Sequence, residues 1–228
     1  MNIRAEASER ANSVIESIQA TVDMDTKWGR KLAPEEDEVR RFILREFPNL
    51  GSAPTNSEIA EALSLPSEEV EGILKNLHES DIIYMKDGEI LGAYPFSARP
   101  TVHKVALKGG RARKAYALCA IDALGIPFMF DEDVDIESAC VHCGEGISIK
   151  IRDGSIVEQL PEGALVWIGL RYSSHAATSL CTSLVFLHSK EHLEKWRTKN
   201  PGEDGKALSL AEGMHVGKVL FEGRLREK

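Results

Sequence analysis

Cys119 and Asp122 are the first residues in this sequence whose types and spacing could do chemistry. They stand three positions apart in the apolar run KAYALCAIDALGIP, residues 114–127. On a helix, positions i and i+3 share one face, so the thiol and the carboxylate would be in contact. Asp122 could then take the thiol proton when a soft metal captures sulfur, and later return it. The alternative is a small core cysteine beside an aspartate at a helix boundary, and this pair alone favours that alternative.

The other three cysteines raise the question of a bound metal. Cys140 and Cys143 form a C-x-x-C pair followed by Gly144, which is half of the spacing of a structural zinc site. Cys119 and Cys181 could complete a four-thiolate site. Both lie in apolar runs expected to be regular structure, whereas such ligands usually come from turns, so zinc is the less favoured interpretation. The sequence holds neither a phosphate-binding glycine loop nor a G-x-S-x-G nucleophile motif.

Bulk composition limits the class of protein. The chain has 228 residues, 43% of them hydrophobic and 28% charged. This composition is typical of a globular protein. A formal net charge of −8 argues against a nucleic-acid binder. No stretch approaches the roughly 20 apolar residues that cross a membrane, and the N-terminus does not resemble a signal peptide. We therefore expect a cytoplasmic protein that binds neither nucleic acid nor membrane, with cysteines present as thiols or metal ligands.

Two segments precede the cysteines. Residues 1–33 are predicted to be a polar, partly helical leader. Residues 34–96 show three helical patterns and then two short strands around Asp87-Gly88, a strong hairpin signal. This order predicts a winged-helix-like module. Its third helix carries four glutamates against a single lysine and would repel phosphates, so the module is expected to serve packing or to act as a lid.

The remainder, residues 97–228, is predicted to be an α+β catalytic domain. Short strand-like segments alternate with helical ones without a regular βαβ pattern, which indicates a mixed or antiparallel sheet with flanking helices. The run KAYALCAIDAL is predicted to be helical. Further helices are predicted after the N-cap residue Ser189 and near the C-terminus.

In the segments that hold Cys119, Cys140 and Cys181, the sequence resembles the alkylmercury (organomercurial) lyases. The resemblance covers roughly residues 35–220, with matching order and spacing, through short motifs: YMKDGEILG from Tyr84, YALCAIDAL from Tyr116, ESAC from Glu137, GEGISI from Gly144, PEGA from Pro161 and SLCTSLVFLHS from Ser179.

The resemblance implies a catalytic set of Cys119, Asp122 and Cys181. The implied reaction is protonolysis of the carbon–mercury bond of R–Hg⁺, giving a hydrocarbon and Hg(II). Two thiolates on mercury push electron density toward carbon, and Asp122 delivers the proton. Hg(II) would then remain on the two thiolates beside Asp122, for removal by a cellular thiol or a mercuric reductase. No organic cofactor is implied.

Several alternatives stay open. Leu118 stands where the family usually has an aromatic residue, and Thr182-Ser183 follow Cys181 where Cys-His is common. The rival interpretation is a noncatalytic thiol protein that binds mercury, copper or zinc. Cys140 matches a family cysteine of structural role, whereas Cys143 is extra. The pair is a mercury hand-off site, a zinc site or no site at all, and the last is slightly preferred.

Overall fold

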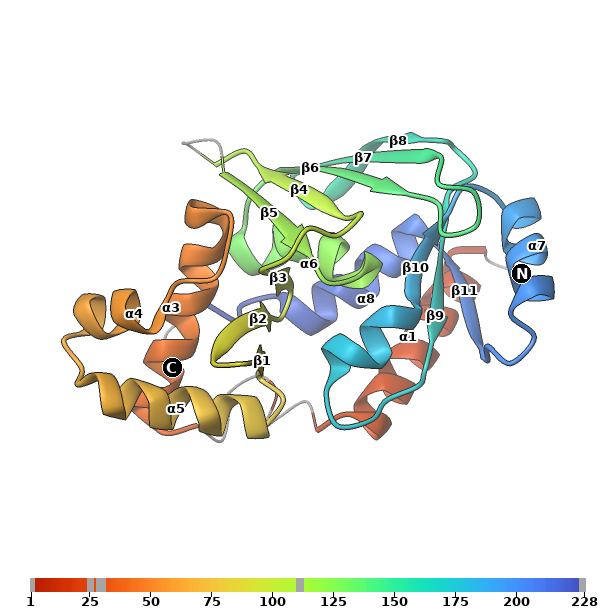
Figure 1. The fold of residues 1–228 in the computed structure, drawn as a ribbon. Coiled ribbons are helices and arrows are strands. Elements are labelled where there is room, and N and C mark those ends of the chain that lie inside the picture. The colour runs from red at the N-terminus through yellow and green to blue at the C-terminus, as the bar shows by residue number, and fades with distance from the viewer. Residues whose placement is uncertain (1–2, 24–26, 28–31, 110–112, 226–228) are drawn as a thin grey trace.

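Helices and antiparallel sheets make up the protein, as the α+β prediction requires (Figure 1). The computed structural model describes residues 3–23, 27, 32–109 and 113–225. Within these residues, no helix is long and apolar enough to cross a membrane.

Three helices and a hairpin form the N-terminal part after the leader. Their bounds are α3 (Pro34–Leu50), α4 (Asn56–Leu63), α5 (Ser67–Glu79), β1 (Ile83–Lys86) and β2 (Glu89–Ala93). Thr55 and Glu58 form the capping box that begins α4. Asp87 and Gly88 both adopt positive φ in the tight turn, so the Asp-Gly signal predicted this hairpin correctly.

The hairpin continues into a larger antiparallel sheet. Eight strands are hydrogen-bonded in the order β1-β2-β3-β5-β4-β6-β7-β8. The remaining bounds are β3 (Phe96–Ser97), β4 (Lys104–Leu107), β5 (Arg113–Ala117), β6 (Val134–Ala139), β7 (Gly146–Arg152) and β8 (Ser155–Leu160). The inward residues of β6 and β7 alternate with exposed or half-buried ones, which is the period expected of a sheet with one covered face.

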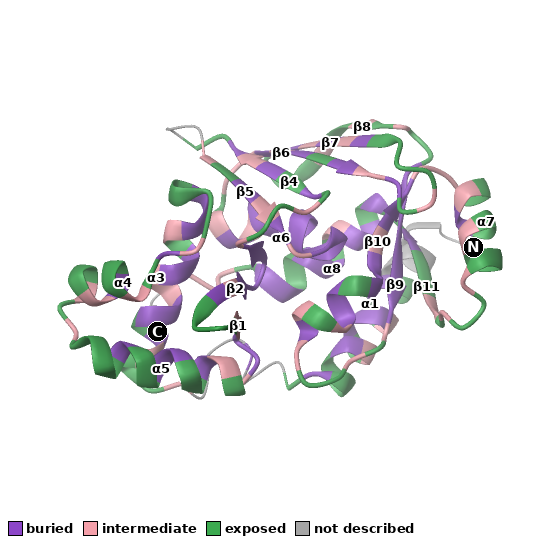
Figure 2. Ribbon diagram, in the orientation of Figure 1, coloured by how far each residue is buried: buried purple, intermediate pink, exposed green. Residues whose placement is uncertain are grey.

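Helix α6 (Ala120–Phe130) follows β5 directly and lies among buried residues (Figure 2). The helical prediction for KAYALCAIDAL was therefore wrong in its first half, because residues 113–117 form strand β5. Alternate residues of this strand are buried, and this period of two outweighs the helix propensity of Lys and Ala. The chain turns from strand to helix at Cys119.

A smaller sheet and the last helices complete the fold. The strands of the smaller sheet lie in the order β10-β9-β11, and both pairs are antiparallel. Their bounds and those of the neighbouring helices are β9 (Leu165–Gly169), η1 (Ala176–Thr178), η2 (Leu180–Ser183), β10 (Leu184–Leu187), α7 (Lys190–Lys199), β11 (Gly205–Ser209) and α8 (Leu210–Phe221). Ser189 caps α7 as the sequence predicted.

The N-terminal leader contributes a packed helix. Helix α1 (Ile3–Thr21) contacts α8. Its buried residues form an apolar stripe of Ala11, Val14, Ile15 and Ile18. This i, i+3, i+4, i+7 spacing is the signature of an amphipathic helix. The boundaries after residues 33 and 96 stay predictions.

Two glycines set the closest approach of α6 and α8. A Cβ added to Gly217 of α8 would lie 2.9 Å from the backbone nitrogen of Gly125 and 3.0 Å from its Cα. Side chains therefore cannot separate the two helices at this point. The contact holds α6, and hence Cys119 and Asp122, against the C-terminal helix.

Gly217→Ala is expected to lower the free energy of unfolding by about 1–3 kcal/mol, because the new methyl group forces two backbones apart. The control is Gly72→Ala on the exposed face of α5, where a Cβ meets nothing within 4 Å. That change should raise the free energy of unfolding by about 0.5–1 kcal/mol through helix propensity. Urea unfolding followed by circular dichroism measures both, and equal effects would show that the α6–α8 contact is not tight.

Candidate active site

Cys119, Asp122 and Cys181 come together in space, although 59 positions separate Asp122 from Cys181. Cys119 is the N-cap of α6, and its sulfur accepts a hydrogen bond from the backbone N–H of Asp122 at 3.4 Å. Cys181 lies in η2, with its sulfur 3.6 Å from Oδ2 of Asp122. One ligand atom from each residue lies within 4.8 Å of the others. Two sulfurs this close can bind one metal, since each thiolate bond to zinc, for example, is about 2.3 Å.

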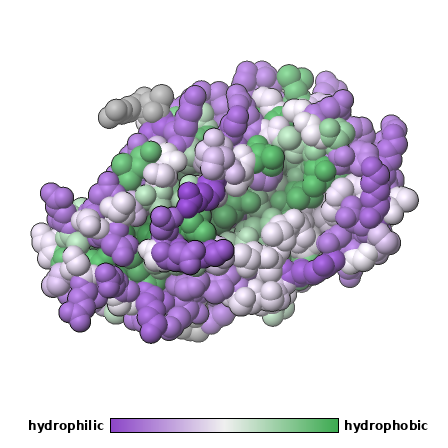
Figure 3. All heavy atoms as spheres, viewed as in Figure 1, coloured by the Kyte–Doolittle hydropathy of each residue, from purple (hydrophilic) through white to green (hydrophobic). Residues whose placement is uncertain are grey.

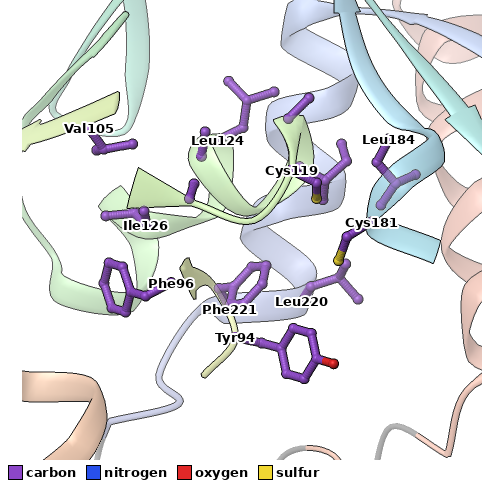
Figure 4. Close-up of a cluster of buried hydrophobic side chains, with 14 of the residues drawn as sticks. Tyr94, Phe96, Val105, Cys119, Leu124, Ile126, Cys181, Leu184, Leu220 and Phe221 are labelled. Carbon is purple, nitrogen blue, oxygen red and sulfur yellow. The ribbon is translucent and has the colours of Figure 1, made fainter. Parts of the chain in front are cut away.

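The three residues are enclosed by apolar side chains. Cys119 is 1% exposed, Asp122 5% and Cys181 8%. Asp122 and Cys181 line a cavity of about 40 Å³, and its other walls are Ile18, Val22, Lys27, Tyr94, Ile121, Ala176, Leu180, Leu184, Leu220 and Phe221. Figure 4 shows both cysteines beside several of these residues, and Figure 3 shows hydrophobic residues gathered in the middle of this face of the molecule. A reagent bound here is largely shielded from water.

The surroundings make the two thiols unequal. Burial, a hydrogen bond to Cys181 and the nearby Asp122 all raise the pKa of the Cys119 thiol well above its usual range. A hydrogen bond from Cys119 lowers the pKa of Cys181, while burial and the carboxylate raise it, with a net increase. Cys181 is also the thiol that lines the cavity. It is therefore the sulfur better placed to meet a reagent first.

The surroundings of Asp122 favour the neutral, protonated form of its carboxyl group. Burial raises its pKa to about 7, against the opposing effects of hydrogen bonds from both cysteines and the positive charge of Lys27. A carboxyl group with this pKa can take a proton and return it at neutral pH. Raised pKa values of this kind are typical of catalytic acids and bases.

A buried ion pair beside the thiols was missed by the sequence analysis. Nζ of Lys27 lies 2.7 Å from Oδ2 of Asp81 and 3.5 Å from the centre of the Tyr94 ring. Burial lowers the pKa of Lys27, and the charge of Asp81 opposes that effect. The apolar stripe of α1 was the available signal, because it indicates that the leader packs on the domain and can carry Lys27 inside.

Asp81 also anchors the segment that carries Cys181. Its carboxylate accepts hydrogen bonds from the hydroxyl groups of Tyr94 at 2.5 Å and Tyr172 at 3.0 Å. The backbone N–H of Ala176 donates to the same carboxylate at 3.1 Å. One carboxylate thus ties the leader, the segment after the hairpin and the loop before η2 together. Each of these bonds restricts the position of Cys181.

The other two cysteines belong to a separate cluster. Cys140 and Cys143 lie beside His192, and no four-thiolate group forms among the residues described. His188 and Glu145 complete the neighbourhood. The H-x-x-x-H spacing of His188 and His192 is visible in the sequence and would have indicated this cluster.

Two thiols and a carboxyl group in a water-poor cavity define a site for thiol-dependent chemistry on a soft metal. A family model described as alkylmercury lyase matches residues 96–222. Alkylmercury lyases of Bacillus cereus and Clostridium butyricum are each 30% identical to the chain over 210 residues, which cover 90% of this chain and 90% of the relative. The chain belongs to the alkylmercury lyase family.

A solved structure agrees with this assignment. The mercury-bound form of MerB2 superposes with a TM-score of 0.72 at 26% identity, covering 92% of this chain and 98% of that one. The covered share of this chain is larger than the segment of residues 96–222 that the family model matches.

Proposed function

We propose that the protein is an organomercurial lyase that cleaves the carbon–mercury bond of R–Hg⁺ by protonolysis. The observation that carries the proposal is the convergence of Cys119, Cys181 and Asp122 within 4.8 Å in a buried apolar cavity. Family membership supports the same activity. The products are a hydrocarbon and Hg(II).

The reaction begins at Cys181. R–Hg arrives bound to a cellular thiolate, and the Cys181 sulfur displaces that thiolate, which leaves with the Cys181 proton. Cys119 then binds mercury as a second thiolate and transfers its proton to the Asp122 carboxylate. Mercury is a soft metal and binds both sulfurs strongly.

Asp122 completes the reaction. The two thiolates push electron density onto the carbon, and the Asp122 carboxylic acid protonates it as the carbon–mercury bond breaks. The hydrocarbon leaves, Hg(II) stays on the two sulfurs, and Asp122 is again a carboxylate. The Cys181 proton leaves with the cellular thiol and the Cys119 proton ends in the hydrocarbon, so the protons balance and the proposal includes no organic cofactor.

The size of the cavity bears on the choice of substrate. Its volume is about 40 Å³, which exceeds what one water needs. A cavity that binds benzene is much larger, at roughly 150 Å³. A methyl group therefore fits with little movement. A phenyl group requires the apolar walls to separate.

The finer features of the protein stay proposals. The order of three helices and a hairpin supports a winged-helix-like module, and the glutamates of α5 support a packing or lid role over nucleic-acid binding. The four cysteines are free thiols. Transfer of Hg(II) to cellular thiols or a mercuric reductase is a prediction that follows from the chemistry of the product, and a cytoplasmic location stays a prediction from the sequence.

The rival function is noncatalytic binding of mercury, copper or zinc by the same thiols. Purified protein given methylmercury with excess small thiol is expected to release methane over many turnovers, measured by gas chromatography of the headspace. Phenylmercury should give benzene. Stoichiometric capture of the organomercurial without hydrocarbon release would establish the binding protein instead.

A further inference from the structure

A turn and a helix bring a second set of metal-binding side chains together, away from the cavity. The turn follows β6 and holds Cys140 and Cys143, whereas His192 belongs to the first turn of α7. Nδ1 of His192 lies 3.6 Å from the sulfur of Cys140 and 3.3 Å from that of Cys143. The three ligand atoms lie within 4.8 Å of one another.

The backbone of the turn is shaped to present both sulfurs. The N–H of Gly144 donates to the carbonyl of Cys140 at 2.8 Å, and the N–H of Cys140 donates to the carbonyl of Glu145. Gly144 has a φ of +78°. Residues with a side chain rarely adopt this conformation. A C-x-x-C-G turn of this kind is the usual half-site of a structural zinc.

Further donors complete the set. Oε2 of Glu145 lies 3.4 Å from the sulfur of Cys143 and 3.8 Å from Nε2 of His188. The ligand atoms of Glu145, His188 and His192 also lie within 4.8 Å of one another. Two thiols, an imidazole and a carboxylate or second imidazole supply the four ligands of a tetrahedral site.

We propose that Cys140, Cys143 and His192, with Glu145 or His188 as fourth ligand, bind a structural Zn²⁺ ion. Zinc accepts sulfur, imidazole nitrogen and carboxylate oxygen, whereas softer ions prefer sulfur alone. The mixture of donors therefore matches the four-coordinate demand of zinc, whereas the two sulfurs alone would satisfy Hg(II). This site is additional to the proposed lyase site and does not depend on it.

Strand β10 separates the two sites. Cys181 lies just before this strand and His188 just after it. Four extended residues span roughly 13 Å. One ion therefore cannot contact both sites. The backbone N–H of Val141 donates to the carbonyl of Phe186 at 3.0 Å, so a zinc ion would fasten the turn, the end of β10 and α7 to one another.

The test is zinc binding by the full-length reduced protein after chelator treatment, titrated against a chromophoric chelator. One zinc per chain is expected. Cys143→Ser and His192→Ala should weaken binding by more than the roughly 10–100-fold that loss of even an outer ligand partner causes. Cobalt(II) should show a thiolate charge-transfer band that Cys143→Ser reduces. Both variants change side chains outside the core, whereas Cys140 is 2% exposed and its loss could unfold the turn.

Two controls locate the ion. His142→Ala should leave zinc affinity unchanged, since the His142 ring only packs against that of His192, with 5.4 Å between the ring centres. The double variant Cys119→Ser/Cys181→Ser should keep its zinc. Absence of zinc binding by the reduced protein, retention of zinc by Cys143→Ser and His192→Ala, or loss of zinc from the double variant would each overturn the proposal. So would uptake of Hg(II) but not Zn²⁺ at Cys143, or a Cys140–Cys143 disulfide that persists under reducing conditions.

Discussion

Asp122→Asn should capture methylmercury on Cys181 and release almost no methane. Asparagine keeps the shape of the side chain, but an amide neither takes the Cys119 proton nor delivers one to carbon. General acids contribute about 10²–10⁴-fold to such steps, and the dry cavity offers water little chance to substitute, so we expect a loss of at least this size. Headspace methane and bound mercury are measured on the same sample. Methane release close to the wild-type rate would show that another group supplies the proton.

The stability of Asp122→Asn provides an independent check on the pKa. The folded-state pKa of Asp122 is about 7. An unfolded aspartate has a pKa of about 3.9. Burial therefore favours the protonated form, and the associated stability is complete below pH 4 and is lost as the pH rises through 7.

Above pH 7, the free energy of unfolding of the variant should exceed that of the wild type by up to about 4 kcal/mol, since one pKa unit is about 1.4 kcal/mol. The difference should narrow toward pH 4, because the wild-type carboxyl group is then protonated in both states. Urea unfolding of both proteins between pH 4 and pH 8 measures this difference in the free energy of unfolding. A difference that does not change with pH would contradict the raised pKa.

The two cysteine substitutions should both stop hydrocarbon release but differ in how they capture substrate. Cys119→Ser keeps the cavity-lining thiol, so one methylmercury should bind rapidly to Cys181 and remain there. Cys181→Ser leaves Cys119 as the only thiol of the catalytic set, and because Cys119 is 1% exposed and has the more strongly raised pKa, capture at the site should be markedly slower. Stopped-flow competition with a chromogenic thiol, at one equivalent of methylmercury, measures both rates.

Cys143→Ser is the matched control for this comparison. It removes the exposed thiol outside the cavity, which would itself capture methylmercury, so Cys119→Ser and Cys181→Ser are compared in this background. Equal capture rates for Cys119→Ser and Cys181→Ser would contradict the order of attack. Methane release by either single variant would contradict the need for two thiolates.

Local patterns predicted most of the elements. The Asp87-Gly88 turn and the N-cap Ser189 are short-range signals, and each has the predicted role. The start of α6 was misplaced because residues 114–124 are helix formers, while the sheet partners that make residues 113–117 a strand are β3 and β4. Pairing with distant strands outweighed propensity there.

The site was predictable only in part, because its members come from distant positions. The spacing of Cys119 and Asp122 allowed a reactive pair but alone favoured an ordinary core cysteine, and the resemblance to a family supplied Cys181 and the catalytic role. Lys27 had only the indirect signal of the apolar stripe of α1, and Asp81 had none, since single charged residues in polar segments usually lie on the surface. Their burial follows from tertiary packing.

The C-x-x-C turn shows the same limit. Half of a metal site is weak evidence on its own, and the slight preference for no site rested on a packing role for Cys140 being sufficient. His192 lies 49 positions after Cys143 and approaches from helix α7. Because of this separation in sequence, His192 was not recognised as a partner of the two cysteines. The H-x-x-x-H spacing of His188 and His192 would have indicated a pair of metal ligands.

The walls of the cavity have a consequence for synthesis of the chain. Ile18 and Val22 belong to its beginning, whereas Leu220 and Phe221 are among its last residues. Translation proceeds from the N-terminus, so α8 emerges after both reactive thiols. A nascent chain on the ribosome therefore carries Cys119 and Cys181 without the enclosure that makes them a pair. Protonolysis becomes possible only once α8 has left the ribosome and docked.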